Sequence, residues 1–165
     1  MPDIAIRPAR HTDAERIAAI YNEAVATTTA TFDTRPESAE ERRTWLVEHD
    51  GPQWPVLVGV EEGIVVGWAS LSRYSDRCAY SGTAEVSTYV AADHARRGIG
   101  TQLTRALLEA GARAGTHAVI ARICTENAGS LAMAERLGFE KVGVMREVGR
   151  KFERWLDVAI LEKMP

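Results

Sequence analysis

Apolar residues recur along this chain with two spacings, one typical of strands and one typical of helices. The strand-like spacing begins with Ile4 and Ile6, which alternate with polar or small residues until Pro8. A hairpin signal at Glu62 and Gly63 separates two apolar runs. The pattern predicts strands around 4–8, over 56–60, 64–71, 83–91 and 118–123, and at about 140–144 and 155–161.

Helical spacing fills two of the intervals near the start of the chain. Thr12 and Glu15 have the spacing of a capping box, in which two side chains satisfy backbone N–H groups at a helix start. Ser38 and Glu41 form a second box of the same kind. The first box precedes an apolar stripe of Ile17, Ile20, Tyr21, Ala24 and Val25.

Two further helices are predicted in the second half of the chain. The helix over 99–114 places its apolar residues on one stripe, as a helix packed on a sheet does. Asn127 is suited to cap the next helix and Gly138 to end it. The order of elements predicts an α/β (α+β) fold with a mixed central β-sheet flanked by helices. No linker interrupts the pattern, so we expect a single domain over residues 1–165.

Composition narrows the classes of partner. With 165 residues and 45% hydrophobic content, the chain is long enough to bury one core. Its net charge of −3 argues against nucleic acid or an anionic membrane as a partner. Neither the two cysteines nor the four histidines have the spacing of metal ligands, so we expect no metal. No signal peptide or long apolar span is found, and a cytoplasmic location is expected.

The most informative segment is 86–101, VSTYVAADHARRGIGT, in which a strand and a polar loop lead to glycines that open a helix. Free backbone N–H groups at a helix start, with Arg96 and Arg97 beside them, form a suitable site for phosphate. The alternative is a glycine turn with two solvated arginines. The segment has neither the third glycine of a dinucleotide-binding motif nor the Gly-Lys-Ser/Thr of a P-loop.

A second motif follows about 30 residues later, at 126–139, with the sequence ENAGSLAMAERLGF. The R-G-x-G loop followed by N-x-x-S, a helix and L-G-F resembles the GNAT superfamily of N-acetyltransferases. Within it, the chain is most similar to the phosphinothricin and methionine sulfone acetyltransferase group, which acylates the amino group of small amino-acid-like compounds. Further matching segments are 20–22, 30–32, 84–90, 149–152 and 154–158. The resemblance implies the same mixed fold.

The resemblance also implies a site for acetyl-CoA. The pantetheine arm is expected beside the strand that carries Thr88, Tyr89 and Val90, with a backbone N–H near Tyr89 and Val90 stabilising the oxyanion. Asn127 and Ser130 are expected to contact the cofactor, although Asn127 also has a simpler role as a helix cap. The pyrophosphate is expected on the turn formed by Arg96, Arg97, Gly98, Ile99, Gly100 and Thr101.

Glu85 is the expected general base, because it lies immediately before this strand, where the family places its carboxylate. The alternative is a charged residue on a solvated strand. A glutamate of ordinary pKa, about 4.3, is a weak base for an ammonium group. Glu85 is therefore expected to act through water or to attract and orient the amine.

The acceptor site is expected in the polar loop over 73–82 and in the segment 30–32. An acceptor that carries a carboxylate or phosphinate would be held by an arginine, whose guanidinium binds such groups with two hydrogen bonds. The alternative for each arginine is simple solvation. The expected acceptor residues are Phe32, Arg73, Tyr74, Arg77 and Tyr80. Trp155 is assigned to the core or a dimer interface, and segment 151–157 to closing the pocket of a neighbouring subunit in a homodimer.

Three positions differ from the family pattern. Ala95 stands where Gln or Arg usually begins the glycine turn, which predicts weaker phosphate contact. Ala134 replaces a Tyr or His that could protonate the leaving thiolate. Ser75 stands where relatives tend to have Lys or Arg, which puts phosphinothricin itself in question as the acceptor.

These features together predict an acetyl-CoA-dependent N-acetyltransferase for a small amine of the phosphinothricin, methionine sulfoximine or methionine sulfone type. Two alternatives remain open at the level of the sequence. One is acetylation of a protein or peptide N-terminus or lysine, and the other is a non-catalytic CoA-binding module.

Overall fold

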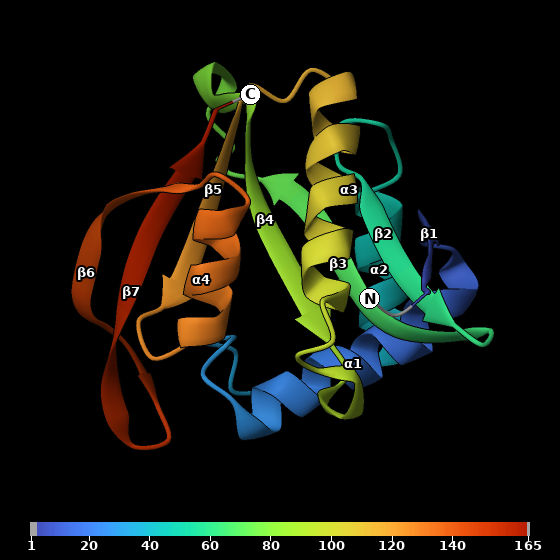
Figure 1. The fold of residues 1–165 in the computed structure, drawn as a ribbon, viewed down its shortest axis with the longest axis horizontal. Helices are drawn as coiled ribbons and strands as arrows, with labels where there is room; N and C mark the ends of the chain where they lie inside the picture. The colour runs from blue at the N-terminus through green and yellow to red at the C-terminus, as the bar shows by residue number, and fades with distance from the viewer. Residues whose placement is uncertain (1–2, 165) are drawn as a thin grey trace.

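The computed structural model describes residues 3–164 and contains one mixed β-sheet in that range (Figure 1). The strand order is β1-β2-β3-β4-β5-β7-β6, and every neighbouring pair is antiparallel except β4 and β5. The expected domain over 1–165 extends to residues 1–2 and 165, which lie outside the described part. The strands are β1 (Ala5–Pro8), β2 (Val56–Glu61), β3 (Ile64–Arg73), β4 (Thr83–Val90), β5 (Ala118–Cys124), β6 (Glu140–Lys151) and β7 (Arg154–Lys163).

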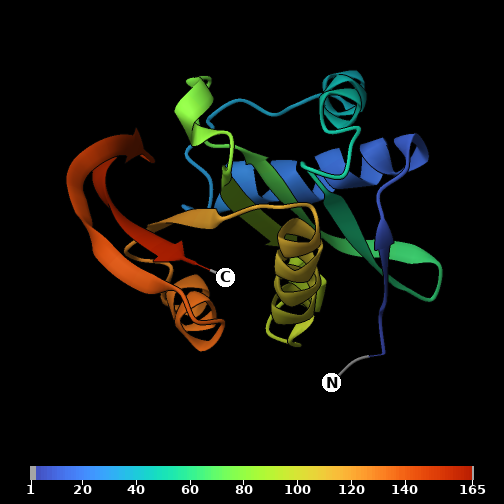
Figure 2. The ribbon, with the colours of Figure 1, turned by 90° about the horizontal axis from the view of Figure 1, so that it is seen from above.

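Helices cover both faces of the sheet, which confirms the predicted mixed α/β architecture. Figure 2 shows α1 (Ala14–Thr27) and α2 (Ala39–Glu48) on one face, and α3 (Ile99–Arg113) and α4 (Ala128–Arg136) on the other. Val58, Val65 and Trp68 pack against the first pair, whereas Leu57 and Val66 belong to the core under the second. Burial on both faces explains why β2 and β3 are nearly continuous apolar runs.

The start of α1 differs from the prediction. The capping box of Thr12 and Glu15 is wrong, because a 3-10 turn (His11–Asp13) precedes α1, and the Asp13 carboxylate caps the start of that turn. This carboxylate accepts a hydrogen bond from the backbone N–H of Arg10 at 2.7 Å and two from the Arg7 guanidinium at 2.7 and 2.9 Å. The hydrogen bonds from Arg7 lower the pKa of buried Asp13. The second predicted box is confirmed at the start of α2.

The closing hairpin is longer than the sequence pattern indicates. β6 reaches Lys151 and turns into β7 through Phe152 and Glu153, both with positive φ (50° and 63°). This two-residue turn has no Asn-Gly or Asp-Gly signal to reveal it. A register shift between Met145 and Gly149 also interrupts the alternation of β6. The prediction therefore stopped the strand too early.

The central feature of the sheet is the separation of β4 from β5. These two parallel strands pair at three positions, Thr83 with Ala118, Ala84 with Val119 and Glu85 with Ile120. Beyond Glu85 they diverge (Figure 1), while β4 continues to pair with β3 as far as Val90. An opening is therefore left in the middle of the sheet, between two strands that each remain paired on their outer sides.

We predict that Asp13→Asn lowers the free energy of unfolding by about 1–2 kcal/mol at pH 7, because the substitution removes the charge of a buried carboxylate that accepts two hydrogen bonds from Arg7. The pKa of Asp13 is depressed in the folded state, so its contribution is complete above the unfolded pKa of about 4. It is lost as the pH falls through the folded pKa. Urea unfolding at pH 7 and pH 3 should therefore show a difference between variant and wild type that shrinks in acid.

Glu15→Ala, at an exposed position, is the control, since it would remove the side-chain acceptor of the capping box if Thr12 and Glu15 formed one. An equal loss of stability in both variants would contradict the assignment of the cap to Asp13.

Candidate functional site

A cavity of about 520 Å³ occupies the opening between β4 and β5. Residues 86–89 of β4 and 121–124 of β5 line its two sides. The segment 29–32, which follows α1, and residues of α4 form further parts of its wall, together with single residues of α1, α3 and β7 and two of β6. Of the residues expected to bind ligand, the cavity brings together Phe32, Glu85, Thr88, Tyr89, Asn127 and Ser130.

The β4 edge provides backbone groups for a ligand. Residues 86–89 form their ladder with β3, and alternate backbone N–H and C=O groups point away from it into the opening. Such groups need a partner. An extended molecule with amide groups can supply one by lying along the strand, as a peptide does when it adds to a sheet edge. Thr88 Oγ1 lies 2.8 Å from Thr104 Oγ1, which ties this edge to α3.

The helix start expected to bind phosphate is present at the N-terminus of α3. Gly98 caps the helix with φ 80°, and Arg96 before it also has a positive φ of 59°. The first intrahelical bond from this cap is Gln102 N–H to Gly98 C=O at 3.1 Å, which leaves the amides of Ile99, Gly100 and Thr101 without intrahelical acceptors. The glycine turn therefore has the geometry of an anion site.

The two arginines of this turn differ in their surroundings. Arg97 forms a bidentate ion pair with Glu61, at 2.7 and 3.0 Å, so its guanidinium is already engaged. Arg96 is exposed and, within residues 3–164, has no ion pair. If an anion binds at this turn, we expect Arg97 to donate mainly its backbone N–H and Arg96 to supply the positive charge.

Asn127 caps α4, as its simpler role predicted. Its side-chain oxygen accepts a hydrogen bond from the backbone N–H of Ser130 at 3.1 Å. Both residues also line the cavity, and the Asn127 amide nitrogen remains a donor. Ala134 lines the same cavity, so this position faces the ligand space without a group that could donate a proton.

Glu85 has a partner that sequence reasoning missed. Arg122 of β5 donates from Nε to Oε1 at 2.8 Å and from Nη2 to Oε2 at 2.7 Å, and both residues line the cavity. The hydrogen bonds to Glu85 raise the pKa of Arg122. A signal for Arg122 was available, since it is the only charged residue of the apolar strand β5.

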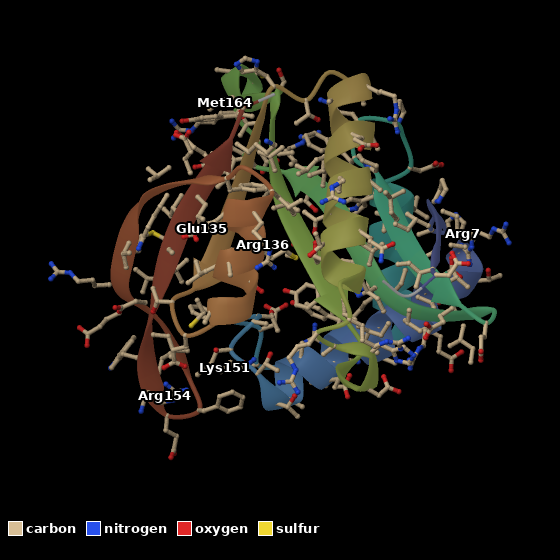
Figure 3. The ribbon with its side chains drawn as sticks, viewed as in Figure 1. Arg7, Glu135, Arg136, Lys151, Arg154 and Met164 are labelled. Carbon is tan, nitrogen blue, oxygen red and sulfur yellow. The ribbon has the colours of Figure 1, made fainter. Side chains whose placement is uncertain are left out.

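Aromatic side chains form the wall opposite α4. The Tyr21 and Tyr89 rings meet edge to face with centroids 5.1 Å apart, and burial raises the pKa of Tyr89 to about 12. Phe32 lies so close to Gly149 of β6 that a Cβ built there would be 2.1 Å from the ring. Lys151, labelled in Figure 3, donates from Nζ to the Thr31 carbonyl at 2.8 Å. The β6–β7 hairpin therefore holds the segment that carries Phe32.

The remaining acceptor candidates lie next to the cavity rather than in it. Tyr74, Arg77 and Tyr80 line a second, shallow hollow together with Ser75 and Arg122. The rings of Tyr74 and Tyr80 meet edge to face at 5.4 Å. Arg73 lines neither space and approaches Asp76 at 3.6 Å. Arg122 is thus the residue that the cavity and the hollow share.

Comparison with known proteins decides the family. The family model that describes the acetyltransferase (GNAT) domain matches residues 6–160 of this chain. The chain belongs to the GNAT acetyltransferase family. This result confirms the expected family and its enzyme class. Within residues 3–164, no group of three or more His, Cys, Asp or Glu side chains could hold a metal ion, and no helix is long and apolar enough to span a membrane.

Two curated relatives have activities of the expected kind. A phosphinothricin N-acetyltransferase of Streptomyces coelicolor is 39% identical over 98% of this GNAT chain and 96% of the relative. An L-methionine sulfoximine/L-methionine sulfone acetyltransferase of Pseudomonas paraeruginosa is 38% identical over 96% of this chain and 92% of the relative. Two homologues that align over nearly the full length of the chain therefore support N-acetyltransferase activity of this protein on small molecules.

A solved structure agrees with the fold in detail. A putative acetyltransferase from Salmonella typhimurium, determined with its cofactor acetyl-CoA, superposes with a TM-score of 0.95 and 34% identity. The match covers 98% of this chain and 93% of the Salmonella protein. The sheet with its central opening is therefore the architecture of an acetyltransferase that binds acetyl-CoA.

We predict that Gly149→Ala destabilises the protein by about 1–3 kcal/mol, because its Cβ would overlap the Phe32 ring and force that segment to move. Gly143→Ala is the matched control on the same strand, where a Cβ meets no atom within 4 Å. Thermal unfolding of both variants measures the difference. Equal stability in the two would show that Phe32 does not rest on Gly149.

Proposed function

We propose that this chain transfers the acetyl group of acetyl-CoA to the amino group of a small amino-acid-like acceptor. The observation that carries the proposal is the position of Glu85, whose carboxylate lies in the cavity beside the open β4 edge. The activities of the two curated relatives support the choice of acceptor, of the phosphinothricin, methionine sulfoximine or methionine sulfone type.

The proposed donor site combines three features of the chain. The pantetheine arm lies along the β4 edge at Thr88, Tyr89 and Val90, where backbone groups point into the opening. The pyrophosphate lies on the amides of the turn over 96–101. Asn127 and Ser130, both on the cavity wall, contact the arm from the N-terminal end of α4. Acetyl-CoA supplies an activated acetyl group as a thioester.

In the reaction, the acceptor nitrogen forms a bond to the acetyl carbon and the carbon–sulfur bond breaks. Glu85 takes the proton of the attacking nitrogen, either directly or through water. A backbone N–H near Tyr89 and Val90 donates to the carbonyl oxygen on which negative charge develops. Ala134 supplies no proton to the sulfur, but the leaving thiol has a pKa near 8.5 and departs as a thiolate.

The ion pair with Arg122 is compatible with this role of Glu85. A carboxylate offers about four lone-pair positions, and Arg122 occupies one on each oxygen. Positions remain on both oxygens for an ammonium group or a water molecule. Glu85 is therefore held in one orientation and still has room to receive the acceptor.

We also propose that the protein is a homodimer that forms through the β6–β7 hairpin. This hairpin exposes five large apolar side chains: Val142 (59%), Val144 (42%), Val148 (52%), Phe152 (49%) and Trp155 (60%). β6 is also a long edge strand, which soluble proteins usually cover or protect. The exposure of Trp155 excludes the core as its location and favours the interface. The cytoplasmic location stays a prediction.

We predict that Glu85→Gln lowers kcat for small acceptors by a factor of about 100 or more, because the amide cannot accept the proton. The measurement is thiol release from acetyl-CoA with methionine sulfone, methionine sulfoximine, phosphinothricin and a short peptide as acceptors. Glu62→Gln, at the exposed β2–β3 turn, is the control and should keep wild-type rates.

The panel separates the competing functions. Acetylation of the peptide but of no small amine would favour a protein acetyltransferase. Acetyl-CoA binding without turnover on any acceptor would favour a non-catalytic module. Unchanged turnover in Glu85→Gln would remove Glu85 from the mechanism.

We predict that Val142→Glu converts the dimer to a monomer, because it places a charge in an apolar interface. Ile64→Glu is a matched control, since Val142 and Ile64 are both β-branched and both 59% exposed, but Ile64 lies at the β2–β3 turn. Sedimentation velocity should show the loss of the dimer in Val142→Glu alone. A monomeric wild type, or an equal effect of both variants, would contradict the proposed interface.

A further inference from the structure

We propose that Arg122 binds the carboxylate of the acceptor and that Arg122 and Glu85 together form a receptor for an α-amino acid. The inference rests on the proposed function and adds a residue that determines which amines are accepted. The observation behind it is a bidentate ion pair that lies at the junction of the cavity and the shallow hollow.

Arg122 has hydrogen-bonding capacity left after it pairs with Glu85. A guanidinium carries five N–H groups, and the pair with Glu85 uses one on Nε and one on Nη2. Three remain, two of them on Nη1. The Arg122 side chain is 54% exposed whereas that of Glu85 is 23% exposed, so the arginine is the more accessible partner.

The hollow beside Arg122 has the charge of an anion site. Its described lining consists of Tyr74, Ser75, Arg77, Tyr80 and Arg122, and therefore includes two guanidinium groups and no carboxylate. The side chain of Arg77 forms no ion pair within residues 3–164. Two positive groups with phenol and hydroxyl donors around them suit a carboxylate or phosphinate.

The ion pair also matches the arrangement of charges in an α-amino acid. Its ammonium and carboxylate groups are attached to one carbon atom, so a receptor must present opposite charges side by side. Glu85 and Arg122 do so, with contacts of 2.7 and 2.8 Å. Glu85 would receive the amino group at the cavity, and Arg122 would hold the carboxylate toward the hollow.

The alternative is that Arg122 only orients Glu85. The two roles differ in what they do to different acceptors. Loss of an orienting contact changes the turnover of every amine, whereas loss of a carboxylate-binding group matters only for acceptors that carry the carboxylate. A pair of acceptors that differ in this group therefore separates the two roles.

The test uses methionine sulfone and its α-carboxamide as acceptors for wild type, Arg122→Gln and Arg122→Lys. We expect Arg122→Gln to raise the KM for methionine sulfone by a factor of about 10–100, the range for a charge-assisted hydrogen-bond pair. The same substitution should change the KM for the carboxamide by less than about twofold, because this acceptor has no carboxylate for Arg122 to bind. Arg122→Lys should recover part of the loss for the acid, because it keeps the charge but not the planar fork.

Arg105→Gln, an exposed arginine of α3, is the control and should leave both acceptors unchanged. An equal effect of Arg122→Gln on both acceptors would overturn the inference and leave Arg122 as a positioning residue for Glu85. Equal KM values of the wild type for acid and amide would also overturn it, while the proposed function would stand.

If no amine is acetylated, the proposed function is rejected. Calorimetry then measures the binding of both acceptors to the protein loaded with CoA. Binding of methionine sulfone that depends on Arg122 would still uphold the receptor, and binding that does not depend on Arg122 would reject it.

Discussion

The separation of two parallel strands is the constraint on which the site depends. β4 and β5 share three paired positions and then part, although each remains bound to an antiparallel neighbour on its other side. The sheet therefore stays intact while an opening forms at its centre. Backbone groups that a closed sheet would pair internally are left for a ligand. The cavity and the position of Glu85 at its wall both follow from this parting.

The residues proposed for the chemistry lie on both sides of the opening. β4 carries Glu85 and the edge proposed for the donor, whereas β5 carries Arg122, 37 residues later. Neither strand alone would hold a carboxylate and a guanidinium in contact. The three paired positions fix the relative register of β4 and β5, and the side chains meet at the point where that pairing ends. The same short ladder thus closes the sheet and places two opposite charges in the wall of the cavity.

Local patterns in the sequence predicted most of the elements but not the interactions between distant ones. Periodicity and capping residues located the four helices and the seven strands along the chain, because burial on one or two faces produces a regular spacing of apolar residues. The start of α1 was mispredicted because Asp13 is held by Arg7 from β1. β6 was predicted too short, because its bulge interrupts the alternation of apolar residues and its turn into β7 contains no glycine. Glu85 was predicted as the base from its place before a motif, and this role stays a prediction. Its pairing with Arg122 depends on strand register, which alternation does not encode.

The contact between Phe32 and Gly149 shows how a position without a side chain can shape the wall of the cavity. The Phe32 ring forms part of the cavity wall, and it occupies space that any Cβ at Gly149 would need. Gly149 itself lies on β6, outside the cavity lining. A substitution of Gly149 would displace the Phe32 ring and so change the shape of the cavity, while every residue that lines the cavity stayed the same. Homologues with identical cavity-lining residues can therefore differ in the shape of the cavity through a single position on β6.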